Sequence, residues 1–298
     1  MGFSLVGEAL GVLGGGMSGR SHKLGMWVAG GLCFAGITPV LAELPGLAER
    51  EWLGYFVGFQ NKKFQFSITT QGKAAIKVFG KRGEPLAQKL TIPVEFLVEE
   101  IRPNGKASAK NLKPETLESA QPATHNPQQL VIRGKVTGEA SFEVFVNADR
   151  RVISLGGRLL DPGTLTKNPL RFSIRVKFPD AYPSAKASAD KKEERELKDK
   201  LKNDRLQLSW TDGTRVRQPI DKAVDASSKE INGPGIAAMQ VELSAYDEKK
   251  FDFTASPGST LTLSNSKSAP LHEGFTAIWI AEPAADPAGK ARLSFEVK

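Results

Sequence analysis

The feature that most constrains the fold of this chain is a period-two alternation of apolar and polar residues that recurs along its length. It is cleanest in residues 170–178, where every second residue is apolar. Such alternation is typical of a β-strand with one buried face. We therefore expect Arg171 and Arg175 to lie on the solvent face and the apolar set to be buried. That set is Phe172, Ile174, Val176 and Phe178.

Further segments of this kind, separated by turns rich in Gly, Pro and Asn, predict an all-β protein. Because proline lacks a backbone donor, Pro93 predicts an edge or a bulge inside its strand. Residues 107–127 hold three prolines and little periodicity, which predicts a long loop. The predicted strands are residues 52–59, 64–69, 74–79, 89–101, 129–136, 140–147, 151–160, 170–178, 205–210, 215–219, 238–246, 251–255, 260–263, 275–281 and 291–297.

Residues 183–204 break the β pattern. Within them, residues 190–202 favour a helix whose apolar stripe is only Leu197 and Leu201, so a solvated helix is expected rather than a coiled-coil partner site. This segment predicts a boundary between two β-sandwich-like units of mainly antiparallel strands. The predicted organisation is an N-terminal β domain at 43–182, a charged helical linker or insertion at 183–204 and a C-terminal β domain at 205–298. The alternative is one large β-sandwich or barrel with a helical insertion.

Residues 1–42 predict a secretory signal peptide. A basic lead-in precedes a long uncharged run that ends in an A-x-A-like cleavage site at residues 40–42. Met17 would begin a signal of ordinary length and is an alternative start. A transmembrane anchor is the other interpretation, but the glycines and Pro39 favour cleavage. We therefore expect an exported protein, periplasmic or extracellular.

The only cysteine of the 298-residue chain is Cys33, inside the predicted signal. The remaining 256 residues then have no disulfide or cysteine ligand, and their stability must come from the core. The formal net charge is +8 for the whole chain and +7 without the leader. This excess permits contact with anionic polymers. The expected partner is an anionic glycan or another envelope polymer, with no specific nucleic acid and no transmembrane segment after cleavage.

Local catalytic and metal-binding motifs are absent from the sequence. It has no nucleophile elbow, P-loop, dinucleotide-binding glycine pattern or calcium loop. His125 and His272 belong to no spaced ligand pair, so both are interpreted as loop residues. No metal and no other cofactor is expected, and no catalytic residue is assigned.

Two sets of side chains could still serve a saccharide. The carboxylates on predicted strands are interpreted as a solvated face, with a glycosidase pair about 5–9 Å apart as the alternative. They are Glu95, Glu99, Glu100 and Glu143. The aromatic residues are interpreted as core, with a sugar-stacking platform as the alternative. They are Trp52, Tyr55, Phe56, Phe59, Trp210, Tyr246 and Trp279.

The chain contains one internal echo. Residues 59–67 and 246–254 each run through an aromatic residue, two turn residues, Lys-Lys, Phe-x-Phe and a hydroxyl residue. Duplication and independent convergence of two hairpins both account for it. The lysines at the tips form the candidate binding residues, as a basic patch for anionic polymers or as devices that keep hairpin tips soluble. They are Lys62, Lys63, Lys249 and Lys250.

The sequence supports three hypotheses of function. The first is a non-enzymatic β module that binds or scaffolds in the cell envelope or extracellular space. The second is a polysaccharide-active hydrolase with a carboxylate pair on a β-scaffold. The third is a lipid-carrying barrel, which would need an apolar, unfilled interior. The fold class alone does not choose among them.

Overall fold

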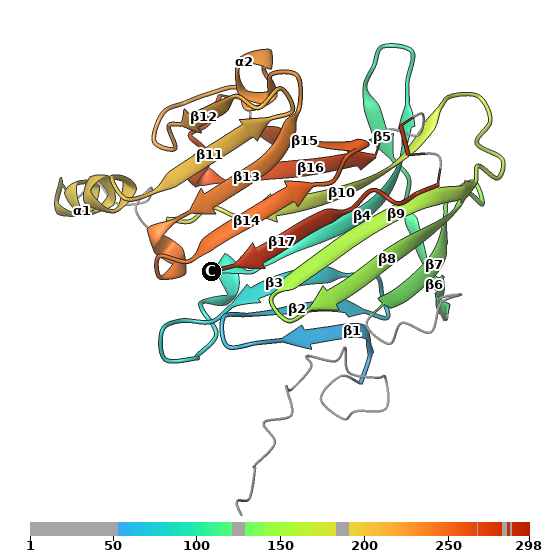
Figure 1. Ribbon diagram of the computed structural model, residues 1–298, viewed down its shortest axis with the longest axis horizontal. Helices are drawn as coiled ribbons and strands as arrows, with labels where there is room; N and C mark the ends of the chain where they lie inside the picture. Colours follow the sequence, from blue (N-terminus) through green and yellow to red (C-terminus); the bar gives the residue numbers. More distant parts are fainter. Residues whose placement is uncertain (1–52, 121–128, 183–190, 267, 282–284, 287) are drawn as a thin grey trace, which may run out of the picture. The chain divides into compact units, whose positions relative to one another are not determined.

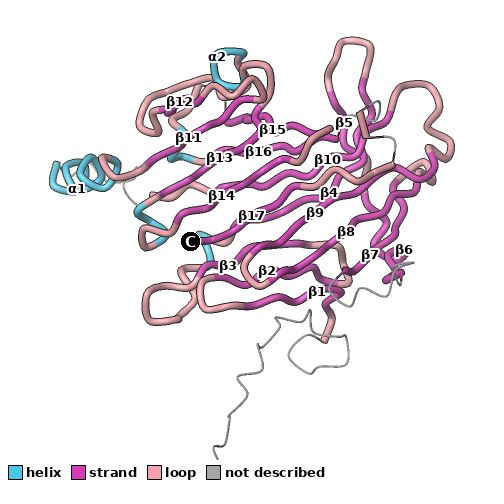
Figure 2. The backbone as a smooth tube through the Cα atoms, in the orientation of Figure 1, coloured by secondary structure: helices cyan, strands magenta, loops and turns pink. Residues whose placement is uncertain are grey.

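We describe a computed structural model of the chain, which covers residues 53–120, 129–182, 191–266, 268–281, 285–286 and 288–298 (Figure 1). These residues all belong to one compact unit, residues 40–298. The predicted signal peptide at 1–42 lies outside the described residues. Within the described part, strands make up most of the chain, with two α-helices and short 3₁₀ turns between them (Figure 2).

The first of two sheet layers contains strands from the beginning, middle and end of the chain. Its antiparallel pairings run in the order β1-β2-β3-β4-β10-β16-β15, and the short β5 pairs with the end of β4. The strands are β1 (Tyr55–Gln60), β2 (Phe64–Thr69), β3 (Ala74–Val78), β4 (Ile92–Ile101), β5 (Ala107–Ala109), β10 (Leu170–Phe178), β15 (Ser259–Asn265) and β16 (Phe275–Ala281).

The second layer is also antiparallel and is paired in the order β6-β7-β8-β9-β17-β14-β13-β11-β12. A bridge between Ile236 and Leu261 joins β13 to β15, so the two layers form one nearly closed sheet. The strands are β6 (Leu112–Ala120), β7 (Gln129–Val136), β8 (Ser141–Asp149), β9 (Val152–Asp161), β11 (Arg205–Trp210), β12 (Arg215–Gln218), β13 (Ile236–Glu242), β14 (Lys250–Ala255) and β17 (Leu293–Val297).

The all-β class predicted from the alternation is confirmed. Two pairings, β10 with β16 and β9 with β17, join strands from the two sides of residues 183–204. The arrangement therefore follows the alternative of one large sheet structure with a helical insertion. The domain limits at 43–182 and 205–298 stay predictions about independently folding units. The insertion contains α1 (Lys191–Leu201), as predicted, and its Leu197 and Leu201 pack against the core.

The long loop predicted at residues 107–127 is wrong in part, because the described residues there form β5 and β6. Pro114 cannot donate to the β6–β7 ladder, and the register shifts between Lys113 and Glu118. The hydroxyl of Thr116 takes over the pairing. It accepts a hydrogen bond from the backbone N–H of Lys135 at 2.8 Å and donates to the carbonyl of Lys113 at 2.7 Å.

Pro93 lies where β4 has a neighbour on one side. It pairs in register with Ala75 of β3, and the pairing of β4 with β10 begins only at Val94. The missing N–H of the proline therefore costs no bond to β10, in agreement with the predicted edge position.

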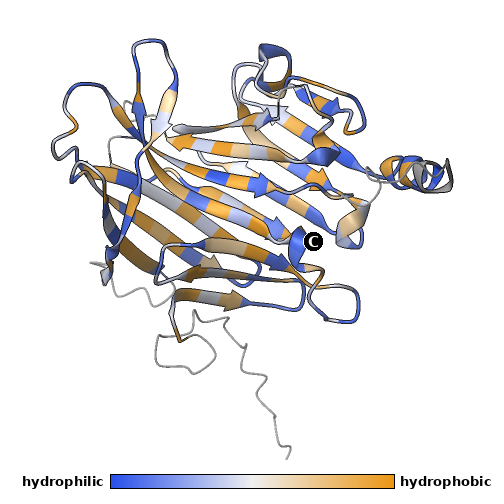
Figure 3. Ribbon diagram, turned by 180° about the vertical axis from the view of Figure 1, so that it is seen from behind, coloured by the Kyte–Doolittle hydropathy of each residue, from blue (hydrophilic) through white to orange (hydrophobic). Residues whose placement is uncertain are grey.

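Aromatic side chains fill the space between the layers. The ring of Phe178 in β10 lies 5.6 Å from Phe251 and 5.9 Å from Phe253, both in β14 of the other layer. Phe295 of β17 contacts Phe66 of β2 at 5.7 Å. Apolar and polar residues alternate along these strands, as the colouring in Figure 3 shows. The predicted inward face of residues 170–178 is buried, and Arg171 and Arg175 are half-buried on the other face.

We predict that Phe172→Ala destabilises the protein by about 3–5 kcal/mol, because the side chain is buried and stacks on Phe142 at 6.2 Å. Leu160→Ala is the control, since Leu160 is 44% exposed and should change stability by less than about 1 kcal/mol. Denaturant unfolding measures both. Equal effects of the two substitutions would mean that the inward face has been assigned wrongly.

Candidate functional site

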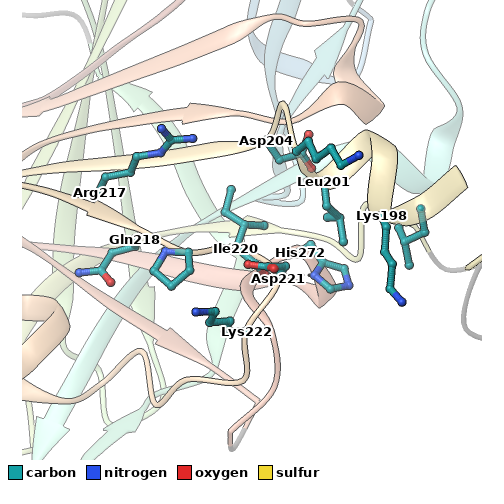
Figure 4. A pocket seen from close by; sticks show the side chains of 12 residues that line it. Lys198, Leu201, Asp204, Arg217, Gln218, Ile220, Asp221, Lys222 and His272 are labelled. Carbon is teal, nitrogen blue, oxygen red and sulfur yellow. Dashed lines mark hydrogen bonds between the residues drawn. The ribbon is translucent and has the colours of Figure 1, made fainter. Parts of the chain in front are cut away.

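A pocket of about 870 Å³ opens between α1, the end of β12 with the segment that follows it, and the 3₁₀ turn Leu271–Glu273 before β16 (Figure 4). Its apolar lining comes from Leu197, Leu201, Pro219 and Ile220. Its cations are Lys198, Lys202, Arg217 and Lys222, which come from two separate parts of the chain. The exposed carboxylate of Asp221 also lines the pocket, which therefore combines an apolar surface with four cations and one exposed anion.

A buried carboxylate, Asp204, is part of the pocket lining. Asp204 Oδ2 accepts a 2.7 Å hydrogen bond from the Tyr182 hydroxyl, and Oδ1 accepts from the backbone N–H and the hydroxyl of Ser244, each at 2.7 Å. The N–H of Ala245 donates to the Tyr182 oxygen at 3.2 Å. Burial and then the bond to Asp204 raise the pKa of Tyr182, so its hydroxyl stays protonated. Three donors therefore occupy the Asp204 carboxylate, which makes its role structural.

His272 is buried at the pocket wall, where the sequence had suggested a plain loop residue. Its backbone N–H and its Nδ1 both lie within hydrogen-bond distance of the Ile220 carbonyl, at 3.2 Å and 3.1 Å. Because a carbonyl oxygen only accepts, this contact assigns the proton to Nδ1 and leaves Nε2 for the pocket. No spacing signal in the sequence reveals this, since Ile220 lies 52 residues away. His125 lies outside the described residues.

The cations around the pocket are mostly exposed. Lys202 forms an ion pair with Asp199 at 2.7 Å. Arg217 and Lys222 form no ion pair with any residue that the structure describes. Figure 4 shows Lys198, Arg217 and Lys222 arranged around Ile220 and His272. Arg217 and Lys222 are therefore without an ion pair among the described residues, although the carboxylate of Asp221 also lines the pocket.

The expectation that the strand carboxylates form a solvated face is wrong for two of the four. Glu99 is 0% exposed because two arginines of β10 cover it, and Glu143 is 2% exposed because it lies between Arg133 of β7 and Arg158 of β9. Glu99 accepts from Arg171 Nε at 2.9 Å and also pairs with Arg175. Burial by itself raises the pKa of Glu99, but the hydrogen bond and charge of Arg171, followed by Arg175, leave that pKa below its usual value.

The other two carboxylates, Glu95 and Glu100, are half-buried. Glu95 pairs with Lys177 at 2.5 Å. Glu100 accepts from Asn168 at 2.6 Å and also pairs with Lys110. Each of the four strand carboxylates is therefore held by neighbouring side chains.

The interpretation of the aromatic residues as core is confirmed for Phe59, Tyr246 and Trp279, each at most 1% exposed. Trp210 donates its indole N–H to the Ile231 carbonyl at 3.1 Å. Tyr55 and Phe56 are half-buried, and Trp52 lies outside the described residues. These aromatic residues do not gather into an exposed sugar-stacking platform in the described part of the chain.

The hairpin-tip lysines lie at one end of the molecule. Lys62 lines a hollow of about 550 Å³ together with Lys81. Lys81 also contacts the second hairpin, because its backbone N–H donates to Asp247 at 3.1 Å and its ammonium pairs with Glu248 at 3.4 Å. Lys250 forms an ion pair with Glu242 at 3.3 Å. Lys63 and Lys249 are half-buried beside these residues. A shared binding role for the four lysines stays a prediction.

The echoed segments share their core contacts but not their turns. Phe64 and Phe66 of the first segment and Phe253 of the second all contact Phe295. In the first turn the Asn61 side chain accepts the N–H groups of residues 63 and 64, whereas residues 247 and 248 of the second turn have positive φ. The lysine tips are therefore not built in the same way.

The described residues include no group of three or more His, Cys, Asp or Glu side chains placed to hold a metal ion. Likewise, none of the helices in the described part has the length and apolar composition needed to span a bilayer. No protein-family model and no curated protein matches the chain.

Among solved structures the chain matches several at low sequence identity. One is the alpha-N-acetylgalactosaminidase NagBb of Bifidobacterium bifidum in complex with GalNAc, with 12% identity, a TM-score of 0.47 and coverage of 81% of this chain. This chain spans only 36% of that enzyme.

Two further similar structures match over nearly their whole length. One is a proposed aldose 1-epimerase from Escherichia coli K12. It shows 10% identity and a TM-score of 0.43, and the match covers 81% of this chain and 98% of that chain. The Slr1438 protein of Synechocystis sp. PCC 6803 shows 11% identity and a TM-score of 0.42 over 81% and 94%.

We predict opposite effects for two buried tyrosines. Tyr182→Phe should destabilise the protein by about 1–3 kcal/mol, because it removes the one donor to Oδ2 of buried Asp204 and leaves only the two Ser244 donors at Oδ1. Tyr246→Phe should be neutral or slightly stabilising, because the Tyr246 hydroxyl is buried and has no hydrogen-bond partner in the structure. Thermal or urea unfolding of the two variants measures the difference. A loss of similar size in both would contradict the assigned hydrogen bonds.

We predict that Glu99 contributes to acid sensitivity. Its folded-state pKa is lowered, so its contribution to stability is complete above the ordinary carboxyl value of 4.5 and is lost as the pH falls through the folded-state pKa. Glu99→Gln should cost roughly 3–5 kcal/mol at pH 7, because two arginines lose their partner. It should also flatten the decline of stability below pH 4.5. An unchanged decline in the variant would show that other carboxylates cause it.

Proposed function

We propose that the protein binds an anionic saccharide segment in the pocket beside α1, as a non-enzymatic module. The observation that carries this proposal is the set of cations, Arg217 and Lys222 above all, around an apolar wall formed by α1 and Ile220. An acidic glycan presents both properties, since its sugar rings have apolar faces and its carboxylate or sulfate groups are charged. The excess positive charge of the chain adds a weak, salt-dependent attraction.

The hydrolase hypothesis receives less support. A general acid at neutral pH requires a carboxyl whose pKa is raised. Glu99 has the opposite property, because its arginine partners lower its pKa despite burial. Glu143 is likewise fixed between two arginines. In the pocket, Asp204 is occupied by three hydrogen bonds.

The lipid-carrier hypothesis requires an unfilled interior. Between the layers Phe178 stacks on Phe275 at 4.8 Å and contacts β14 as well, so this part of the interior is occupied by the chain's own rings. The binding hypothesis places its ligand at the surface instead. Export to the periplasm or the extracellular space, where such polymers occur, remains part of the proposal.

We predict that the protein binds tetragalacturonate but not maltotetraose, which has no charge. The double variant Arg217→Gln, Lys222→Gln should bind tetragalacturonate about tenfold more weakly. Isothermal titration calorimetry at low and high salt measures the affinities, which should fall as the salt concentration rises.

The control removes two positive charges elsewhere, at the turn after β4, through Arg102→Gln and Lys106→Gln. It should change the affinity less than about twofold, since distant exposed charges are screened. If both double variants weakened the binding of tetragalacturonate equally, the pocket would contribute only to the net charge and would not be the binding site. A variant with all four hairpin-tip lysines changed to Gln measures how much they contribute to the affinity for tetragalacturonate. An unchanged affinity would indicate that these lysines only keep the hairpin tips soluble. The four are Lys62, Lys63, Lys249 and Lys250.

A further inference from the structure

A second cluster of basic side chains lies on the outward face of β7, β8 and β9. Glu143 of β8 stands opposite Arg133 of β7 and Arg158 of β9 in the strand register. Arg133 Nε donates to one oxygen of Glu143 at 3.3 Å and Arg158 Nε donates to the other at 2.6 Å. The carboxylate side chain is 3% exposed, whereas the two arginine side chains are 52% and 44% exposed. The carboxylate thus lies beneath two accessible guanidinium groups.

A third arginine joins the cluster through Phe145, the next outward residue of β8. The Arg292 guanidinium carbon lies 4.5 Å from the centre of the Phe145 ring, and that of Arg158 lies 6.0 Å from it. Arg292 Nη1 donates to the carbonyls of Gly289 and Ala291, each at 2.8 Å. Stacking and these bonds fix Arg292 beside the pair. The described charges of the cluster are therefore three guanidinium groups, Glu143, nearby Asp286 and the exposed Glu118 of β6, which stands opposite Arg133 in the register.

The cluster has more donors than its own contacts use. A guanidinium carries five N–H donors in a rigid fork. The hydrogen bonds found in the described chain use one N–H of Arg133, and those of Arg158 go to Glu143 and, at 3.4 Å, to the Ala288 carbonyl. Because Glu143 is bound through the Nε atoms, it orients both forks, and among the described residues no hydrogen bond is found to the Nη groups of Arg133 or to Nη2 of Arg158. A buried ion pair is often no more stabilising than apolar residues of similar volume, so stability alone is a weak reason for this arrangement.

We propose that Arg133 and Arg158, oriented by Glu143, form an oxyanion site for a carboxylate, sulfate or phosphate group of a ligand. A planar or tetrahedral oxyanion matches the paired donors of a guanidinium fork. The site is separate from the pocket beside α1, since β17, β14, β13 and β11 lie between β9 and β12 in the sheet order. It does not depend on the saccharide proposal.

The test follows the arginine side-chain Nε–H resonances by NMR during titration with sodium sulfate, phosphate or acetate, with chloride keeping the ionic strength constant. The resonances of Arg133 and Arg158 should shift along a saturable curve with at least one of the three ions, and the ion that binds most tightly identifies the preferred group. Arg158→Lys keeps the charge but loses the fork, and should weaken binding about fivefold. Arg158→Gln should weaken it about tenfold or more.

Two further variants separate the explanations. Glu143→Gln removes a negative charge, so unspecific attraction would strengthen, whereas loss of orientation predicts weaker binding. The pocket variant Arg217→Gln, Lys222→Gln should leave the response of Arg133 and Arg158 unchanged, whatever it does to tetragalacturonate. Linear shifts with all three ions, or a saturable response that persists in Arg158→Gln, would overturn the proposal. Where Glu143→Gln does not fold, Arg158→Lys decides.

Discussion

The contacts of Phe178 and Phe295 between the two sheet layers support the rest of this structure. The ring centre of Phe178, in the middle of the chain, lies 5.9 Å from that of Phe253. The ring centre of Phe295, near the end of the chain, lies 5.8 Å from that of Phe253 and 5.7 Å from that of Phe64. The described residues contain no cysteine, so no disulfide substitutes for this packing. Strands that are far apart in sequence are therefore held in one unit by burial of aromatic surface.

The pocket depends on the same packing. The 3₁₀ turn with His272 leads directly into Phe275, which stacks on Phe178 at 4.8 Å. On the other side, the chain leaves β10 after Phe178 and reaches Tyr182, whose hydroxyl ties it to Asp204 at the start of β11. The buried core thus fixes the base of the pocket, and α1 and the segment after β12 add cations at its surface. A rigid base with solvated charges at its rim suits recognition of a polyanion.

Sequence periodicity predicted most strands because it reports which face of a strand is buried. Periodicity did not predict burial correctly where the exposure of a side chain depends on residues of a neighbouring strand. Glu99 and Glu143 sit at polar positions of the alternation, yet they are buried because arginines from adjacent strands cover them. Pro114 suggested a loop, but this region forms a strand in which the Thr116 hydroxyl accepts the backbone N–H of Lys135 in the neighbouring strand.

The candidate site was largely invisible in the sequence. Its residues come from separate segments, α1, residues 217–222 and the turn at His272, and no spacing rule connects them. The solvated helix at 190–202 was predicted, but not that Leu197 and Leu201 would form a pocket wall. The hairpin-tip lysines were detected because they repeat, which is a signal of sequence and not of geometry.

We propose that an anionic saccharide binds in the pocket beside α1. Hydrogen–deuterium exchange with saturating tetragalacturonate tests it most directly, because it reports position rather than affinity. We expect slower exchange in residues 217–222 and 271–274, with little change in β1 and β2 at the other side of the first layer. Binding that protects other segments while 217–222 and 271–274 exchange as in the free protein would contradict it.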